Sequence, residues 1–256
     1  MKVGEVMRET KRVDKILSNF GFGTRREVKQ LVRNGEVKVD GEVITDSGMH
    51  VDPEKSQIEI SGEKLNYRQY IYIMMNKPSG VISATFDNRH ETVIDILPNE
   101  YKCFDVFPVG RLDIDTEGLL LLTNDGQLAH DILSPKKHVP KKYFAFIEGE
   151  VSEYDVKRFE EGLVLEDGYK TLPAELKILD RGVNSSVEVI IYEGKFHQVK
   201  RMFEAVGKKV TFLKRITMAN LVLDKDLAPG ECRELAQYEV TNLVKEVKGK
   251  KDNSLN

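Results

Sequence analysis

The sequence predicts an α+β protein with a small amino-terminal unit and a larger domain built on a mixed or antiparallel sheet. Two observations support this expectation. The first 65 residues combine two short helical patterns with a hairpin pattern, and from Tyr70 onward strand-like runs alternate with short, irregularly spaced helical stretches. The chain shows no regular strand–helix alternation and no glycine-rich loop after a strand, so a doubly wound nucleotide-binding sheet is disfavoured.

The composition is typical of a folded protein of the cytoplasm. Of the 256 residues, 40% are hydrophobic and 32% are charged, which excludes both a disordered chain and a membrane protein. The first residues lack the apolar core of a secretory signal, and no apolar run reaches the roughly 18 to 20 residues of a membrane span. Cys103 and Cys232 show neither disulfide nor metal-ligand spacing, and we interpret them as buried small hydrophobic residues.

Positive charge is concentrated in three basic islands, although the net charge is −3. Residues 8–38 carry 9 basic and 4 acidic side chains, and residues 195–215 carry 7 basic side chains against Glu204 alone. Residues 134–143 add four lysines and no acid. A solvated surface explains any one island equally well, but three islands in an acidic chain favour a nucleic-acid partner.

The amino-terminal unit has clear local signals. A helix is expected over Val13–Asn19, and a second helix begins after Thr24, because Thr24 and Glu27 have the spacing of a capping box. Apolar residues at 28, 31 and 32 form one face of this second helix. The pair Asp40-Gly41 lies between alternating runs and predicts a hairpin, and a further strand is expected at residues 57–60.

Residues 12–44 resemble the alpha-L RNA-binding domain of the ribosomal-protein S-four type. The resemblance implies a domain over residues 10–65 whose basic helical face docks on structured RNA. Polar residues from Glu63 to Gln69 are expected to form a linker, with residues 66–69 outside both domains. The RNA-binding candidates of this face are Arg12, Lys15, Arg25, Arg26, Lys29 and Arg33.

The larger domain is expected over residues 70–245, followed by a disordered charged tail at 246–256. Its hydrophobic periodicity predicts strands and short helices in an irregular order. The strands are expected at residues 70–75, 119–123, 143–148, 174–179 and 187–192, and the helices at 92–97, 127–133, 153–161 and 198–205.

A cluster of acids lies between Gly110 and the apolar run at 119–122. Its D-x-D-x-E-G spacing imitates a calcium loop, but Asn124 occupies the position of the bidentate glutamate, which excludes that site. In an extended segment Asp113 and Asp115 would share a face at roughly 6 to 7 Å, as in a two-carboxylate hydrolase. A single carboxylate nucleophile is the third interpretation, and a structural role beside a turn is the commonest one.

Residues 110–120 closely resemble the active-site segment of the pseudouridine synthases that modify ribosomal RNA, in the branch that carries an alpha-L domain. Residues 76–81, 141–143, 193–203 and 226–233 match the same family in the same order. The HQVKRMF and LAPGE segments are most similar to the enzymes that act on small-subunit (16S) rRNA. The resemblance implies that rRNA or the assembling small subunit is the partner and that no cofactor or metal is needed.

The same resemblance assigns the catalytic aspartate to Asp113, the active-site tyrosine to Tyr143 and the basic partner of the aspartate to Lys200. Arg201 competes for the last role, because a shift of one position would exchange the two residues. Further RNA contacts are implied for Lys77, Arg111, Lys141, Lys142, His197 and Arg201.

These residues suit the isomerisation of uridine to pseudouridine. An ionised carboxylate can attack the ribose anomeric carbon or assist elimination there, and a nearby cation favours the ionised form. Tyr143 offers a flat surface for the base and a hydroxyl for the proton on ring carbon five. The target nucleotide must first be flipped out of folded RNA.

Three functions remain open at this point: an rRNA pseudouridine synthase for the small or the large subunit, a non-catalytic RNA-binding or ribosome-assembly factor, and a nucleoside N-glycosidase that uses Asp113 and Asp115. The default oligomeric state is a monomer.

Overall fold

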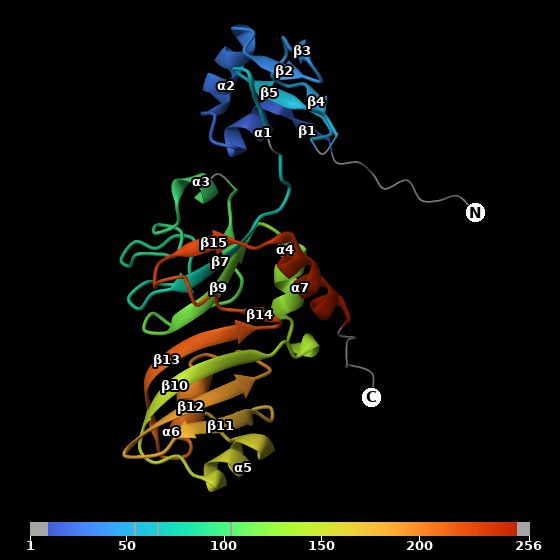
Figure 1. Ribbon diagram of the computed structural model, residues 1–256. Coiled ribbons are helices and arrows are strands. Elements are labelled where there is room, and N and C mark those ends of the chain that lie inside the picture. Colours follow the sequence, from blue (N-terminus) through green and yellow to red (C-terminus); the bar gives the residue numbers. More distant parts are fainter. Residues whose placement is uncertain (1–9, 54, 66, 103, 250–256) are drawn as a thin grey trace, which may run out of the picture. The chain divides into compact units, whose positions relative to one another are not determined.

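The computed structural model describes residues 10–53, 55–65, 67–102 and 104–249. The described residues fall into two compact units (Figure 1). The first unit contains the residues up to Ile71 together with Pro98–Asp105, and the second contains Tyr72–Leu97 and the residues from Val106 onward. The α+β class expected from the sequence is confirmed. Each unit has its own apolar core and is described by itself.

Two helices of the first unit form as the sequence predicts. Helix α1 spans Val13–Asn19 and helix α2 spans Arg25–Arg33. Thr24 caps α2, because its hydroxyl accepts the Glu27 N–H at 3.3 Å while the Glu27 carboxylate accepts the Thr24 N–H at 2.7 Å. Val28 is buried in the core shared with α1, so the basic residues of α2 lie on the opposite, exposed face.

The small sheet of the first unit extends further than expected. Asp40 and Gly41 both have positive φ, 52° and 87°, in the two-residue turn of the predicted hairpin. A second such turn at Ser61-Gly62 continues the sheet, so the first residues of the expected linker form a strand instead. The sheet has the order β3-β2-β5-β6, and a separate pair joins β1 to β4. The strands are β1 Lys11–Arg12, β2 Val37–Val39, β3 Glu42–Val43, β4 His50–Val51, β5 Ile58–Ile60 and β6 Glu63–Lys64.

The second unit is built on one large sheet with the order β11-β12-β10-β13-β9-β7-β15, with β14 and β8 beside β13 and β9 (Figure 1). All pairs are antiparallel except β13 with β9. The strands are β7 Tyr72–Lys77, β8 Phe107–Pro108, β9 Glu117–Thr123, β10 Lys141–Glu148, β11 Glu175–Asp180, β12 Asn184–Ile191, β13 Lys209–Met218, β14 Leu221–Val222 and β15 Cys232–Glu234. The helices are α4 Gly126–Leu133, the 3-10 turn η1 Pro135–Lys137, α5 Glu153–Glu161, α6 Gln198–Glu204 and α7 Gln237–Gly249, while α3 Asn99–Lys102 groups with the first unit.

Helices pack on two parts of the sheet. Helices α4 and α7 lie side by side, and Leu128, Leu243 and Val247 join strand residues such as Leu119 and Leu121 in one core cluster (Figure 1). At the other end α5 contacts β11 and α6 contacts β13, and Phe159 of α5 meets Phe203 of α6 with ring centroids 4.9 Å apart. The apolar run at 119–122 is fully buried, as expected.

Several expectations for the second unit are wrong. The predicted helix at residues 92–97 is a series of turns in which Asp95 accepts hydrogen bonds from Thr92. The predicted tail begins too early, because α7 runs to Gly249 and Val247 is 0% exposed. The strand β13 was not expected. Cys232 is only half-buried, and Cys103 lies outside the described residues.

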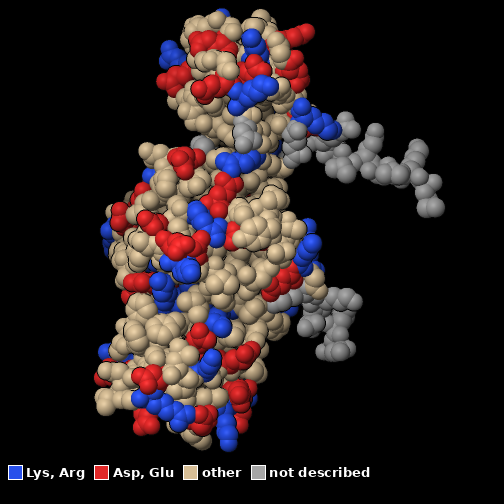
Figure 2. Space-filling view, in the orientation of Figure 1, with Lys and Arg blue, Asp and Glu red and all other residues tan. Residues whose placement is uncertain are grey.

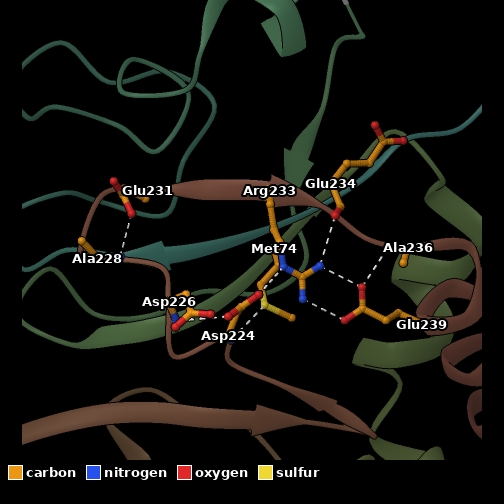
Figure 3. A network of polar contacts seen from close by, with 9 residues as sticks. All are labelled: Met74, Asp224, Asp226, Ala228, Glu231, Arg233, Glu234, Ala236 and Glu239. Carbon is orange, nitrogen blue, oxygen red and sulfur yellow. Dashed lines mark hydrogen bonds and ion pairs between the residues drawn. The ribbon is translucent and has the colours of Figure 1, made fainter.

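A network of charged side chains links β15, the loop at Asp224 and α7 (Figure 3). Arg233 of β15 donates from Nε to Asp224 at 2.6 Å and forms two parallel hydrogen bonds to Glu239 of α7, at 2.8 and 2.9 Å. The Arg233 hydrogen bond holds the pKa of Glu239 below its usual value despite partial burial. The Asp224 N–H contacts the sulfur of Met74, so the network reaches the buried strand β7. Strand, loop and helix are therefore fixed to one another.

The parallel pair of β9 and β13 requires a glycine. Gly118 has φ of 103°, and a Cβ atom at this position would lie 2.2 Å from the backbone oxygen of Arg215. The strands approach each other more closely here than any side chain permits. The segment that enters β9 and the side chains of β13 are thereby brought to the same place.

This close approach predicts that Gly118→Ala will destabilise the second unit by about 3 kcal/mol, from positive φ and steric overlap together. Gly126→Ala is the matched control. Gly126 begins α4 with open space around its Cβ position, so this change is expected to be neutral or stabilising by up to about 1 kcal/mol. Urea unfolding of both variants tests the prediction, and equal stabilities would contradict it.

Candidate active site

A cavity of about 110 Å³ lies where β9 begins beside β13. Most of its wall comes from the segment 109–116, β10, β13 and the start of α6 with the loop before it, and the ends of α4 and β12 add Leu133 and Ile191. Its polar lining includes Arg111, Asp113, Thr116, Lys141, Tyr143, His197 and Arg215. Two of the three predicted catalytic residues, Asp113 and Tyr143, therefore line one cavity.

Asp113 has two cationic or ionisable neighbours from the α6 segment. Lys200 Nζ lies 3.4 Å from Asp113 Oδ2, and His197 Nε2 lies 3.6 Å from Asp113 Oδ1. The Asp113 side chain is 26% exposed, so it is accessible from the cavity. The structure also separates the two candidates for its basic partner: Arg201 forms its ion pair with Asp167, at 2.6 Å.

Lys200 is shared between two carboxylates. Its Nζ donates to Asp115 Oδ1 at 2.6 Å, a shorter contact than the one with Asp113. Burial opposes ionisation of Asp115, but the Lys200 hydrogen bond and charge outweigh it, so the pKa of Asp115 lies below its usual value. The Asp115 side chain is 63% exposed and is not part of the cavity lining. One carboxylate thus faces the cavity, and the other holds the lysine.

The Asp113 segment is a turn and not the extended strand that the two-carboxylate interpretation requires. The Thr116 N–H donates to the Asp113 carbonyl at 3.1 Å, and the Gly80 N–H donates to the Ile114 carbonyl at 2.7 Å. This turn places Asp113 and Asp115 in different surroundings. The extended segment on which the two-carboxylate interpretation depended is absent, although both carboxylates contact Lys200.

Lys77 holds this turn from inside the protein. Its ammonium is 0% exposed and donates to the carbonyls of Pro78 and Thr116, both at 2.9 Å, and of Ile114 at 3.4 Å. A side chain in this position cannot reach RNA, so the predicted RNA contact is wrong. Burial lowers the pKa of Lys77 to about 8, although Asp115 and Asp113 oppose this effect.

A buried network positions the start of α6. Gln198 donates to Glu193 at 2.8 Å and accepts from the Lys195 N–H at 2.8 Å. Tyr169 donates its hydroxyl to the other Glu193 oxygen, and this hydrogen bond raises the pKa of Tyr169 to about 12. His197 precedes α6 with φ of 49°, which turns the chain toward Asp113. Lys200 follows one helical turn later on the same side.

Tyr143 lies in β10 directly opposite Arg215 of β13 and is 7% exposed. Arg215 is 2% exposed, and its Nε donates to the Leu119 carbonyl of β9 at 2.7 Å. The sequence interpretation counted Arg215 in a basic island and did not select it or Thr116. The alternating pattern of β13 would not have shown the burial of Arg215, because this residue falls on the same side as Lys209, Thr211 and Thr217.

The remaining predicted RNA contacts have varied surroundings. The basic residues of α2 are exposed without ion pairs among the described residues, whereas Arg12 pairs with Asp14 and Lys142 with Glu188. Lys141 is buried and donates to the Val139 carbonyl at 2.9 Å. Figure 2 shows basic and acidic side chains interspersed on the visible surface of the second unit, without one broad basic area. Within the islands at 134–143 and 195–215, ion pairs with carboxylates are formed by Lys137, Lys142, Lys200, Arg201 and Lys208.

Similarity to known proteins shows the family of this chain. The sequence matches the RNA pseudouridylate synthase family over residues 71–205 and the S4 domain over residues 11–56. The chain belongs to the RNA pseudouridylate synthase family. It is 52% identical to the uncharacterized RNA pseudouridine synthase YtzG of Bacillus subtilis (strain 168), across 90% of this chain and 96% of that protein.

Other synthases are similar over nearly their whole length. The ribosomal large subunit pseudouridine synthase B of Bacillus subtilis is 39% identical, across 91% of this chain and 95% of its own. The ribosomal small subunit pseudouridine synthase A of Vibrio cholerae is also 39% identical, across 91% and 100%. A pseudouridylate synthase crystal structure aligns with a TM-score of 0.64 at 35% identity, covering 91% of this chain and 99% of that one. The protein is therefore an RNA pseudouridine synthase with an S4 domain.

Two features are absent from the described residues. These residues contain no group of three or more side chains arranged to hold a metal ion. No helix among them is both long enough and apolar enough to cross a bilayer.

The buried ammonium predicts an alkaline limit to activity. As the pH rises through about 8, Lys77 loses a proton and keeps two N–H donors for three carbonyls, so the Asp113 turn loosens and the rate of pseudouridine formation falls. Single-turnover rates from pH 6 to 10 test this expectation. In Lys77→Met the rate should be low throughout and the decline near pH 8 should disappear. A decline that persists in this variant would contradict the assignment.

Proposed function

We propose that this enzyme converts a specific uridine of 16S ribosomal RNA to pseudouridine, with Asp113 as the catalytic nucleophile. The proposal is supported most strongly by one cavity that Asp113 and Tyr143 line together, with Lys200 in contact with Asp113, in a chain of this family. A base stacked within folded RNA cannot enter a cavity in the protein, so the target nucleotide must leave its stack before the reaction.

Asp113 acts on the ribose carbon that carries the base. Its carboxylate either bonds to C1′ or takes the proton from C2′, while the N1–C1′ bond breaks and its electron pair leaves with uracil. Lys200 and His197 hold the carboxylate from two sides and fix its direction. After the base turns, C5 bonds to C1′ while the bond from Asp113 to C1′ breaks or, on the other route, C2′ regains its proton. C5 then loses its proton and N1 gains one, so nothing is gained or lost overall.

Tyr143 confines the base during this rotation. Its ring is buried in the cavity wall, where it presents a flat apolar surface to a pyrimidine. Its place opposite Arg215 in the sheet keeps the ring from moving with the substrate. A detached uracil therefore stays near the sugar long enough for the second bond to form.

The surroundings of Asp115 argue against an N-glycosidase with two equivalent carboxylates. Asp115 is mostly exposed, lies outside the cavity lining and is committed to Lys200. We assign it the role of positioning Lys200. Its removal should weaken the reaction without abolishing it.

The choice of the small subunit rests on the sequence of the α6 segment and the LAPGE segment at residues 227–231. Relatives named for the large and the small subunit are equally similar to this chain, so both RNAs belong in the test. Unmodified 16S and 23S RNA and early particles of each subunit should be incubated with the protein. Chemical mapping of pseudouridine then identifies the target and the preferred form of the substrate.

Asp113→Asn is expected to lower the rate of pseudouridine formation by at least about 10⁴-fold while RNA affinity stays within about twofold, because the nucleophile is lost without a change of shape. Asp115→Asn is the matched control and should lose only about 10-fold. Free uracil released by the wild-type protein, together with equal losses in the two variants, would instead identify a glycosidase. Full biological activity of Asp113→Asn would identify a non-catalytic RNA-binding factor.

The S4 domain supplies a second prediction. Replacing Arg25, Arg26, Lys29 and Arg33 with glutamine should weaken RNA binding and reduce the slope of log affinity against log salt by about 3. The control variant replaces Lys157, Lys170, Lys177 and Arg181, which are also exposed, and should leave the slope nearly unchanged. Identical slopes in the two quadruple variants would contradict docking of α2 on phosphates.

A further inference from the structure

Two buried polar groups in the cavity lack partners. The Arg215 Nη2 and the Thr116 Oγ1 are both inaccessible to solvent, and neither has a hydrogen-bond partner among the described residues. Arg215 is 2% exposed and Thr116 is 1% exposed, yet both residues line the same cavity as Asp113 and Tyr143. Buried polar groups in folded proteins are almost always hydrogen-bonded, so two orphans in one cavity indicate a ligand.

The Arg215 guanidinium is unusually poor in contacts. Of its five N–H donors, only Nε–H donates a hydrogen bond within the described part of the chain, to the Leu119 carbonyl. No acidic side chain among the described residues forms an ion pair with it, whereas Lys200, Arg201 and Lys208 all have such partners. A buried cation without a counter-ion is unfavourable, so this side chain serves something other than stability.

Arg215 lines the cavity from the central part of the sheet. Arg215 lies opposite Tyr143 on one side and beside Gly118 on the other, so its side chain is fixed between β10 and β9. Thr116 ends the turn that carries Asp113, and its own N–H and carbonyl are used by Asp113 and Lys77. Only its hydroxyl remains for a ligand.

The chemistry of the reaction identifies a suitable ligand. When the N1–C1′ bond breaks, the electron pair stays on uracil, and the negative charge spreads from N1 onto the carbonyl oxygens. A buried guanidinium donates to such oxygens and stabilises their charge without needing to reorganise. A threonine hydroxyl can accept the N3–H that lies between the two carbonyl groups.

We propose that Arg215 and Thr116 form the uracil-binding subsite of the active site, in which Arg215 stabilises the base as an anion between the breaking and the making of its bonds to ribose. This inference rests on the proposed function. Arg215 is then a catalytic residue in addition to Asp113, Tyr143 and Lys200, and Thr116 is a specificity residue for the imide edge of the base.

The first test measures binding of free uracil to the full chain by calorimetry or ligand-observed NMR. Arg215→Met should lower uracil affinity at least tenfold, and Thr116→Val, which keeps the shape and removes the hydroxyl, should lower it several-fold. Thr116→Ser should bind like the wild type. The control is Arg181→Met, which alters an exposed arginine that pairs with Glu153 and should have no effect.

Stability and rate separate this role from a structural one. In Arg215→Met an apolar residue replaces a guanidinium that has no counter-ion, so the melting temperature should stay within about 5 °C of the wild type. The rate of single-turnover isomerisation should nevertheless fall at least about 100-fold. RNA affinity should stay within about twofold. Arg215→Lys, which keeps the charge and loses the planar fork, should have an intermediate rate.

The outcomes are distinguishable. Unchanged uracil affinity in folded Arg215→Met overturns the inference, as does a wild-type protein that binds no uracil. If Arg215→Met does not fold, Thr116→Val decides in the same way, because unchanged affinity in that variant also overturns it. A wild type that binds uracil through these residues but forms no pseudouridine in either rRNA would refute the proposed function and leave the subsite intact.

Discussion

The active site depends on a single backbone constraint, the approach of β9 to β13 at Gly118. No side chain fits between the two strands there, and the only parallel pair of the described sheet results. The turn that carries Asp113 directly precedes β9. Because β9 begins at this point, the turn lies beside Arg215 and Tyr143. Lys77 secures the same turn by taking three of its neighbouring carbonyls. Position of the carboxylate is thus decided by main-chain geometry before any side chain of the site contributes.

Several basic side chains of the second unit form ion pairs with neighbouring carboxylates. Lys200, Arg201 and Lys208 each pair with a nearby carboxylate, which reduces the positive charge that these three side chains present to a distant polyanion. The exposed basic face of α2 is differently built, with an apolar side in the core and no ion pairs on its outer side among the described residues. On the proposed function, the exposed basic face of α2 therefore serves RNA binding, and the cavity of the second unit serves conversion of the nucleotide.

Local signals in the sequence predicted local structure well. The Thr24–Glu27 capping box and the Asp40-Gly41 turn involve groups within a few residues of each other, and both form as expected. By contrast, Lys209, Lys214 and Arg215 interrupt the apolar pattern of β13 and concealed the longest strand. Charge alone also suggested exposure for Lys77, yet its surroundings are set by carbonyls up to 39 residues away. Hydrogen bonds between a buried cation and carbonyls this far away in the chain produce no periodic pattern in a single sequence.

The pairing of β15 with β7 has a consequence for folding during synthesis of the chain. Strand β7 ends at Lys77, but its edge partner begins at Cys232, and α7 closes the core only after that. At a synthesis rate of about 5 to 20 residues per second, the ribosome needs roughly 10 to 30 s to make the intervening chain. During this interval β9 can pair with one edge of β7, but the other edge stays unpaired, and an open apolar edge favours aggregation of the incomplete chain.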